Sequence, residues 1–304
     1  MPHKATARVP ASTTNLGPGF DVLGLALQLY STISLEEIDK GREIEVTGVD
    51  VDKLSKDERN MAYRAAHMVF DKCGYAPKGL RLVLRNGIPA IRGLGGSGTA
   101  ILGGLLTANA LCDNPFSRAE LLDFATEFEG HPDNVAASLL GGLVISMMQG
   151  SHVHSIQLDC DSDLRVVVAI PNFSLSTKAA RGVLPKMVDF SDAIHNVSRS
   201  SMLVAAIATG KLEMLSLAMA DRLHQPYRTS LIPGFDDVAE SAMRAGALSV
   251  ALSGAGPSIA AYCTTSTDEV GSQMSQAFRR NQISCDIKVL PIDSAGATVQ
   301  MSRS

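Results

Sequence analysis

The sequence lacks the features of a disulfide-stabilised, secreted or membrane-spanning protein. Its five cysteines are odd in number and widely spaced, so neither a disulfide framework nor a zinc knuckle is predicted. No uninterrupted apolar run approaches the roughly 20 residues that a membrane span requires, and the N-terminal segment lacks the apolar stretch of a secretory signal. We therefore expect a cytoplasmic protein with reduced cysteines and no membrane partner.

The sequence also has no excess of positive charge. The chain has 27 Lys and Arg residues against 31 Asp and Glu, which gives a formal net charge of -4, and it has no basic run. Because nucleic-acid binding depends on a concentrated positive surface, no nucleic-acid partner is expected. The chain does have 304 residues, of which 45% are hydrophobic, and can bury a substantial core. At about 150 residues per domain, two domains are predicted.

Glycine is concentrated in residues 88–100, Ile-Pro-Ala-Ile-Arg-Gly-Leu-Gly-Gly-Ser-Gly-Thr-Ala. Four glycines there allow positive φ and a close approach of the backbone to a ligand: Gly93, Gly95, Gly96 and Gly98. Ser97 and Thr99 add hydroxyls, and the apolar residues 100–112 that follow have the length of a helix. The glycines would then lie at a helix N-terminus, whose unpaired N–H groups attract anions. The stretch predicts a phosphate-binding loop.

Other interpretations of this loop compete with that one. The spacing Gly93-x-Gly95-x-x-Gly98 matches the dinucleotide-binding motif, with Asp113 at the expected distance beyond it. However, Pro89 interrupts the approaching strand, and Asp113 opens a loop instead of ending a second strand. A nucleoside triphosphatase P-loop would need a Lys-Ser/Thr pair after the glycines, which is missing. The remaining alternative is a glycine turn that only packs a helix on a strand.

Residues 11–21, Ala-Ser-Thr-Thr-Asn-Leu-Gly-Pro-Gly-Phe-Asp, form a second notable stretch. It is too rich in turn residues for a strand, so a loop is predicted. Asn15 and Asp21 would be displayed there at the end of a strand, where side chains commonly contact ligands. Alternatively, Asp21 only caps a short helix. Both interpretations stay open.

Polar side chains are densest in residues 129–134. Glu129, His131, Asp133 and Asn134 occupy four of these six positions, a density that is uncommon outside a functional site. The alternative is a polar connection between helices. Beyond the polar residues 159–163, where we expect a second domain to begin, come a loop at 171–181, a charged connection at 221–228 and a glycine turn at 253–258 between two antiparallel strands.

These loops, in order and spacing, resemble the three motifs of the galactokinase, homoserine kinase, mevalonate kinase and phosphomevalonate kinase (GHMP) superfamily, and within it most resemble the homoserine kinases. The resemblance rests on five segments: Pro-Ala-Ser-Thr-Thr-Asn-Leu-Gly-Pro-Gly-Phe-Asp-Val-Leu-Gly at 10–24, Glu-Gly-His-Pro-Asp-Asn-Val at 129–135, Ser-Thr-Lys-Ala-Ala-Arg-Gly-Val-Leu-Pro at 176–185, Gln-Pro-Tyr-Arg at 225–228 and Ser-Gly-Ala-Gly-Pro at 253–257. Together they span nearly the whole chain.

The resemblance implies a two-domain α+β fold. Residues 1–160 would form an ATP-binding domain like the second domain of ribosomal protein S5, and residues 161–304 a ferredoxin-like domain, with the site between them. It also implies transfer of the ATP γ-phosphoryl group, with Mg²⁺, to the side-chain hydroxyl of L-homoserine, giving O-phospho-L-homoserine for threonine biosynthesis. Because the family often forms dimers, a homodimer is expected.

Carried over residue by residue, the resemblance assigns roles to the loop residues. The nucleotide would be bound by Asn60, Pro89, Arg92, Gly93, Leu94, Gly95, Gly96, Ser97, Gly98 and Thr99. Mg²⁺ would be held by Ser97 and Glu129. The catalytic group would be Glu129, Asp133 and Asn134. Homoserine would contact Asn15, Asp21, His131 and Asp133 on one side, and Arg181, Arg228, Gly254 and Gly256 on the other.

The division of the substrate site also makes chemical sense, because carboxylates suit an ammonium and guanidinium forks bind a carboxylate with two hydrogen bonds. Asp133 is either the base for the hydroxyl proton or only an orienting group while the phosphate takes the proton. The phosphate loop departs from the family's common Gly-Leu-Gly-Ser-Ser-Ala, since Gly96 replaces the first serine and Gly98 the alanine. Backbone N–H groups and Thr99 are expected to compensate.

Three other functions remain as alternatives. A mevalonate-type or sugar kinase of the same superfamily would have no ammonium to occupy the acidic side. A nucleotide-dependent oxidoreductase would rest on the glycine spacing alone. A silent nucleotide-binding regulator is disfavoured because both Ser97 and Glu129 are retained.

Overall fold

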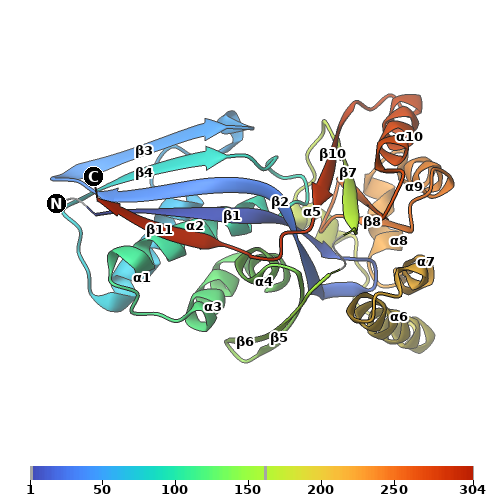
Figure 1. Ribbon diagram of the computed structural model, residues 1–304, viewed down its shortest axis with the longest axis horizontal. Coiled ribbons are helices and arrows are strands. Elements are labelled where there is room, and N and C mark those ends of the chain that lie inside the picture. Colours follow the sequence, from blue (N-terminus) through green and yellow to red (C-terminus); the bar gives the residue numbers. More distant parts are fainter. Residues whose placement is uncertain (1–2, 161–162, 304) are drawn as a thin grey trace.

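The computed structural model describes residues 3–160 and 163–303 and contains two sheets with helices packed against each (Figure 1). The first sheet has seven strands: five run in the order β11-β1-β2-β4-β3, while β5 pairs with β2 and β6 with β5. Their bounds are β1 (His3–Asn15), β2 (Gly19–Glu37), β3 (Gly41–Gly48), β4 (Gly79–Asn86), β5 (Leu143–Gln149), β6 (His152–Leu158) and β11 (Thr298–Arg303).

Four helices cover one face of the first sheet (Figure 1): α1 (Met61–Cys73), α2 (Gly96–Leu111), α3 (Arg118–Glu129) and α4 (Asp133–Leu140). Their ends follow local chemistry. The side-chain oxygen of Asn60 accepts hydrogen bonds from the first turn of α1, which ends at Gly74 in a left-handed conformation. Ser117 and Glu120 form a capping box at the start of α3. The apolar faces of α1 to α4 pack on the sheet as one core.

The second sheet is antiparallel, in the order β10-β7-β9-β8. Its strands are β7 (Arg165–Pro171), β8 (Ser249–Leu252), β9 (Ile259–Cys263) and β10 (Cys285–Pro291). It is buried on both faces, by α9 (Phe235–Arg244) and α10 (Thr267–Arg280) on one and by α6 (Phe190–Ala208) and α7 (Leu215–Ala218) on the other. This strand order, with a helix in each crossover, is ferredoxin-like. The α+β, two-domain fold predicted from the sequence is thereby confirmed.

Short helical turns connect these elements. They are η1 (Val51–Lys53), α5 (Thr177–Gly182), η2 (Leu212–Met214), α8 (Gln225–Arg228) and η3 (Thr229–Leu231). Arg181 and Arg228, expected in a loop and in an irregular connection, therefore lie on α5 and α8. Along the described residues, no helix combines the length and the apolar character needed to cross a bilayer.

The predicted second domain, residues 161–304, needs one correction. Its last strand, β11, leaves the ferredoxin-like unit and pairs antiparallel with β1 at the edge of the first sheet, next to the N-terminus (Figure 1). Residues 161 and 162, at the expected boundary, lie outside the described residues. No local pattern of residues indicates this return, because the strand pairing joins residues nearly a full chain length apart.

The predicted loop at residues 11–21 is also wrong for most of its length. After a bulge next to Pro10, residues 11–14 continue β1 by pairing with residues 24–27 of β2, and Asp21 lies on β2 at a φ of 58°. Only residues 16–18 form the turn. The strand ladder satisfies the backbone groups of these small polar residues, so their turn propensity is overridden.

Candidate active site

A cavity of about 400 Å³ lies between the two units and is lined by segments from both. Most of the predicted site residues line it: Asn15, Asp21, Asn60, Arg92, Gly93, Leu94, Gly95, Gly96, Ser97, Glu129, His131, Asp133, Asn134, Arg181, Arg228, Gly254 and Gly256. Pro89, Gly98 and Thr99, which were also predicted, are absent from its lining. Loops far apart in the sequence thus meet at one concave surface.

The glycine loop, residues 93–98, packs closely against segments of both units. Gly93 and Gly95 have φ of 77° and 72°, and a Cβ would lie 2.1 Å from the Ser253 carbonyl oxygen at Gly93 and 2.3 Å from Ser12 Oγ at Gly95. The carbonyl oxygen of Gly93 accepts a hydrogen bond from Ser253 Oγ at 2.6 Å. Only glycine satisfies both the left-handed backbone and the close contact at these two positions.

The loop leads into α2, which begins at Gly96 and has no side chain capping its first turn. Its first N–H groups therefore have no side-chain acceptor, at the positive end of the helix dipole, and Gly95, Gly96 and Ser97 at this end line the cavity. This is the environment that binds phosphate groups in proteins. The helix starts four residues earlier than the apolar pattern predicted, so Gly98 and Thr99 lie inside it.

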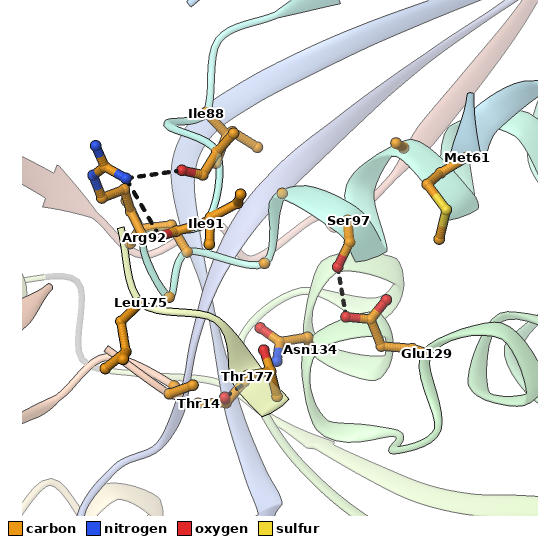
Figure 2. A pocket seen from close by; sticks show the side chains of 18 of the residues that line it. Thr14, Met61, Ile88, Ile91, Arg92, Ser97, Glu129, Asn134, Leu175 and Thr177 are labelled. Atoms are coloured by element: carbon orange, nitrogen blue, oxygen red, sulfur yellow. Dashed lines mark hydrogen bonds between the residues drawn. The ribbon is translucent and has the colours of Figure 1, made fainter. Parts of the chain in front are cut away.

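Ser97 and Glu129 both line the cavity, and their side chains point toward each other (Figure 2). Ser97 Oγ, at the start of α2, donates a hydrogen bond to Glu129 Oε1, at the end of α3, at 2.6 Å. Both are oxygen donors of the kind that Mg²⁺ prefers. No cluster of three or more acidic, histidine or cysteine side chains that could hold a metal is found among the described residues. A cation here would take its other ligands from water or phosphate.

Asp133 and His131 form a buried pair beside this site. His131 Nδ1 lies 2.6 Å from Asp133 Oδ1, which also accepts the N–H of Asn134 at 2.9 Å, and Asp133 is only 2% exposed. Burial disfavours the charged imidazole, but the hydrogen bond and charge of Asp133 outweigh it and raise the pKa of His131. Asn134 is tied to β1 by hydrogen bonds with Ser12 and Thr14.

Asp21 and Arg181 form a two-pronged ion pair, with nitrogen–oxygen distances of 2.7 and 3.0 Å. The expectation that these two residues lie on opposite sides of a substrate therefore needs correction. Arg181 lies on α5, which places its guanidinium beside the Asp21 carboxylate on β2. Because the two side chains carry opposite charges, they pair with each other at this distance. An amphoteric ligand would find both of its charge partners in one place.

Arg228 lies beneath that pair and is 1% exposed. Its Nε donates to the carbonyl oxygen of Ala180 at 3.1 Å, and its guanidinium lies over the ring of Phe20. Burial and then the nearby charge of Arg181 lower the pKa of Arg228 to about 10. Two cations that repel each other at one cavity wall favour an anionic group between them.

Asn15 and Asn60 use their side chains mainly within the protein. Asn15 Nδ2 donates to the carbonyl oxygen of Gly254 at 2.9 Å, which joins the β1–β2 turn to the glycine turn at residues 253–258. Asn60 caps α1 and also donates to the carbonyl oxygen of Ser55. Both residues are buried at the edge of the cavity, so their effect on a ligand is to fix the surface that it meets.

Arg92 is directed away from the phosphate loop's helix (Figure 2). Its guanidinium donates to the carbonyl oxygens of Pro171 at 3.0 Å and Asn172 at 3.2 Å, and to Ser174 Oγ. These contacts attach the glycine loop to the end of β7. They hold the loop in place, and the contact of Arg92 with a nucleotide stays a prediction.

Several lining residues were missed by sequence reasoning. They include apolar and polar side chains around the start of α1 and in the second unit: Leu54, Ser55, Arg59, Met61, Ile91, Leu175 and Thr177. Ile91 and Thr177 lie within the glycine-rich stretch at 88–100 and the segment at 176–185, but neither was given a role, and the others belong to no motif with a recognisable spacing. Thr177 had the strongest signal, since it follows Ser176, which caps α5.

We expect Gly96→Ser to be tolerated. A Cβ at Gly96 would meet no atom closer than 3.8 Å, and its φ is not in the left-handed region, so serine fits the first turn of α2. Replacing glycine there restricts the unfolded chain and should raise stability by up to about 1 kcal/mol. Thermal unfolding measures this. Gly93→Ala is the contrasting variant, and its Cβ clash with Ser253 should lower the unfolding midpoint; equal midpoints for the two variants would contradict the assignment.

The family model described as GHMP kinases N terminal domain matches residues 60–142, and the one described as GHMP kinases C terminal matches residues 203–280. A curated homoserine kinase of Moorella thermoacetica is 47% identical over 292 residues, covering 96% of this chain and 98% of the relative. One of Carboxydothermus hydrogenoformans is 45% identical and covers 95% and 94%. The crystal structure of homoserine kinase from Cytophaga hutchinsonii superposes with a TM-score of 0.90 at 31% identity, covering 98% and 97%.

Proposed function

The chain belongs to the homoserine kinases of the GHMP kinase superfamily, and from that membership we propose that it transfers the γ-phosphoryl group of ATP to the side-chain hydroxyl of L-homoserine. The product would be O-phospho-L-homoserine, which serves threonine biosynthesis. We also propose that the reaction takes place in the cytoplasm, because five widely spaced cysteines, odd in number, form no disulfide pattern.

One observation carries this proposal: a single cavity combines an anion-binding helix start with charge partners for an amino acid. The uncapped first turn of α2 suits phosphates. Asp21 suits an ammonium, while Arg181 and buried Arg228 suit a carboxylate. A mevalonate-type or sugar acceptor would leave Asp21 without a cationic partner from the substrate.

We propose that Ser97 and Glu129 would hold Mg²⁺, whose chemistry when bound is to neutralise charge on the transferring phosphoryl oxygens. The glycine loop and the first turn of α2 position the phosphates through backbone N–H groups. Asp21 would exchange part of its pairing with Arg181 for the ammonium of homoserine. Phosphoryl transfer depends mainly on such alignment and charge stabilisation.

Asp133 is the group that we place against the acceptor hydroxyl. Its Oδ1 already accepts hydrogen bonds from His131 and Asn134, and no described residue donates to Oδ2, so that oxygen is available to the substrate. The hydrogen bond and charge of Asp133 raise the pKa of His131, which favours a positive charge beside the carboxylate. Because a loose phosphoryl-transfer transition state needs little prior deprotonation, we assign Asp133 to orienting the hydroxyl.

A substrate panel tests the proposal. ADP release should be measured with L-homoserine, mevalonate, galactose and shikimate, and the product of homoserine identified as the O-phosphate. 4-Hydroxybutyrate, which keeps the hydroxyl and carboxylate but lacks the ammonium, separates the role of Asp21 from that of the arginines. Turnover with homoserine well above all others supports the proposal; equal use of 4-hydroxybutyrate would contradict recognition of the ammonium.

Ser97→Ala should raise the KM for MgATP by on the order of ten-fold, since it removes one oxygen ligand worth about 1.5 kcal/mol. The fold should be unaffected, because Ser97 is exposed and alanine is the better helix former. Ser117→Ala is the matched control, as it removes the cap of α3 away from the cavity and should lower stability without changing MgATP kinetics. Steady-state kinetics and thermal unfolding of both variants decide between a ligand and a packing role.

We also propose that the partner of this chain is a second copy of itself. On α6, Phe190, Ile194 and Val197 lie on one helix face and are 81%, 55% and 67% exposed. Adjacent exposed apolar side chains of this size mark protein contacts. Phe190→Glu should convert a dimer to a monomer in light scattering, whereas Met147→Glu, on the exposed β5–β6 hairpin, should not. A monomeric parent protein would contradict the proposal.

A further inference from the structure

Two cysteines distant in sequence meet at the far ends of the helices that begin at the cavity. Cys73 is the last residue of α1, and Cys112 follows the last residue of α2. Their sulfur atoms lie 3.3 Å apart, although 39 positions separate them in the chain. Neither is fully buried, so small reagents can reach the pair. The two thiols are not used by any step proposed for the cavity.

A disulfide needs its sulfurs about 2.0 Å apart, so the pair must close by roughly 1.3 Å. Small rotations of the two side chains can bring the sulfur atoms together. Small backbone shifts can add to this, because both residues lie at helix ends, where the backbone is less constrained than in the middle of a helix. Cys263, in contrast, is buried on β9. We propose that Cys73 and Cys112 form a peroxide-oxidisable dithiol, a reversible modification site whose disulfide links α1 to α2.

The chemistry balances with one hydrogen peroxide per disulfide. Burial, and then the adjacent Cys73 thiol, raise the pKa of Cys112. We therefore assign the first attack to Cys73 and the second step to Cys112. Cys73 gives its thiol proton to solvent, and the thiolate attacks the peroxide O–O bond, so that its sulfur becomes a sulfenic acid. The other peroxide oxygen leaves as hydroxide, which takes up that proton and becomes water. Cys112 sulfur then displaces the hydroxyl, which leaves as a second water with the Cys112 proton. A dithiol reductant reverses the reaction by thiol–disulfide exchange.

The link would act on stability and leave turnover unchanged. It closes a loop that contains β4 and the whole glycine loop, and so restricts the unfolded chain. The cavity lies at the other ends of both helices, at Asn60 and Gly95, and α2 alone is about 24 Å long at ~1.5 Å per residue. The oxidised protein is therefore a more heat-resistant form of the same catalyst.

The test uses the full-length protein treated with one equivalent of hydrogen peroxide, followed by alkylation, non-reducing peptide mapping and thermal unfolding. We expect a linked pair of peptides containing Cys73 and Cys112, a mass lower by two hydrogens, and a midpoint several degrees higher that dithiothreitol reverses. Cys285→Ser, another partly buried cysteine, should behave as the parent, while Cys73→Ser and Cys112→Ser should show no shift.

Other results would overturn the proposal. These are a link between other cysteines, a link between two chains, or oxidation of Cys73 to a sulfinic acid without a link. Peptide mapping of the parent protein alone distinguishes them, so the outcome does not depend on how well the serine variants fold. Unchanged turnover after oxidation is also required, and a loss that dithiothreitol restores would contradict a link remote from the cavity.

Discussion

Glu129→Gln is expected to lower kcat/KM by a hundred-fold or more, on the order of 3 kcal/mol. The amide keeps the size of the side chain and can still accept the hydrogen bond from Ser97 Oγ, but it loses the negative charge that a hard divalent cation requires. The expected signature is a loss that is partly recovered at high Mg²⁺ concentration. Kinetics over a range of Mg²⁺ at saturating homoserine measure it.

Stability provides the control for this variant. Glu129 is the last residue of α3, where the helix dipole disfavours a negative charge. Removing the charge should therefore leave the unfolding midpoint unchanged or slightly higher while activity falls. If the charge of Glu129 destabilises α3 but is needed for turnover, its role is to bind a ligand. Full activity of Glu129→Gln at limiting Mg²⁺ would rule out the metal role.

The parts of the fold that could be predicted from the sequence are those specified by neighbouring residues. The start of α1 at Asn60, the capping box at Ser117 and the antiparallel turn at residues 253–258 each depend on a few adjacent side chains. The return of β11 to β1 and the extension of β1 beyond Pro10 depend on pairing with distant strands. Such pairing leaves no local pattern, so both were missed.

In the site, too, features set by neighbouring residues could be predicted and those set by distant residues could not. The sequence identified the segments that line the cavity, because glycines and clustered polar residues are uncommon for packing alone. It could not give the direction of a side chain. Arg92 was assigned to the nucleotide from the family resemblance, and its guanidinium reaches the carbonyl oxygens of Pro171 and Asn172. Asp21 and Arg181, 160 positions apart, were assigned to separate sides and form one ion pair.

Hydrogen bonds between the loops make the position of each loop depend on the others. Ser253 Oγ binds the carbonyl oxygen of Gly93, Asn15 binds that of Gly254, and His224 Nε2 donates to that of Gly17. Each hydrogen bond fixes a loop of one unit against a loop of the other. The small residues of these motifs therefore have two roles. They form the ligand-binding surface, and they allow the close packing that positions this surface.

Arg228→Lys should weaken the use of homoserine by roughly ten-fold to a hundred-fold, about 1.5 to 3 kcal/mol, the value of a hydrogen bond to a charged group. Lysine keeps the positive charge but loses the planar fork that binds a carboxylate with two hydrogen bonds. It also loses the contact of Nε with Ala180, so a packing effect must be separated from substrate binding.

A substrate without the carboxylate makes that separation. 3-Aminopropan-1-ol has the hydroxyl and ammonium of homoserine and should be a poor substrate for the parent protein. If Arg228 binds the carboxylate, the lysine variant should lose much more activity toward homoserine than toward this analogue, with an unchanged KM for MgATP. Arg92→Lys, another buried arginine that donates to backbone carbonyls, is the matched control and should lower the unfolding midpoint without discriminating between the two acceptors. Equal losses on both acceptors in Arg228→Lys would mean that Arg228 only supports α5 and the glycine turn, and the carboxylate would then fall to Arg181 alone.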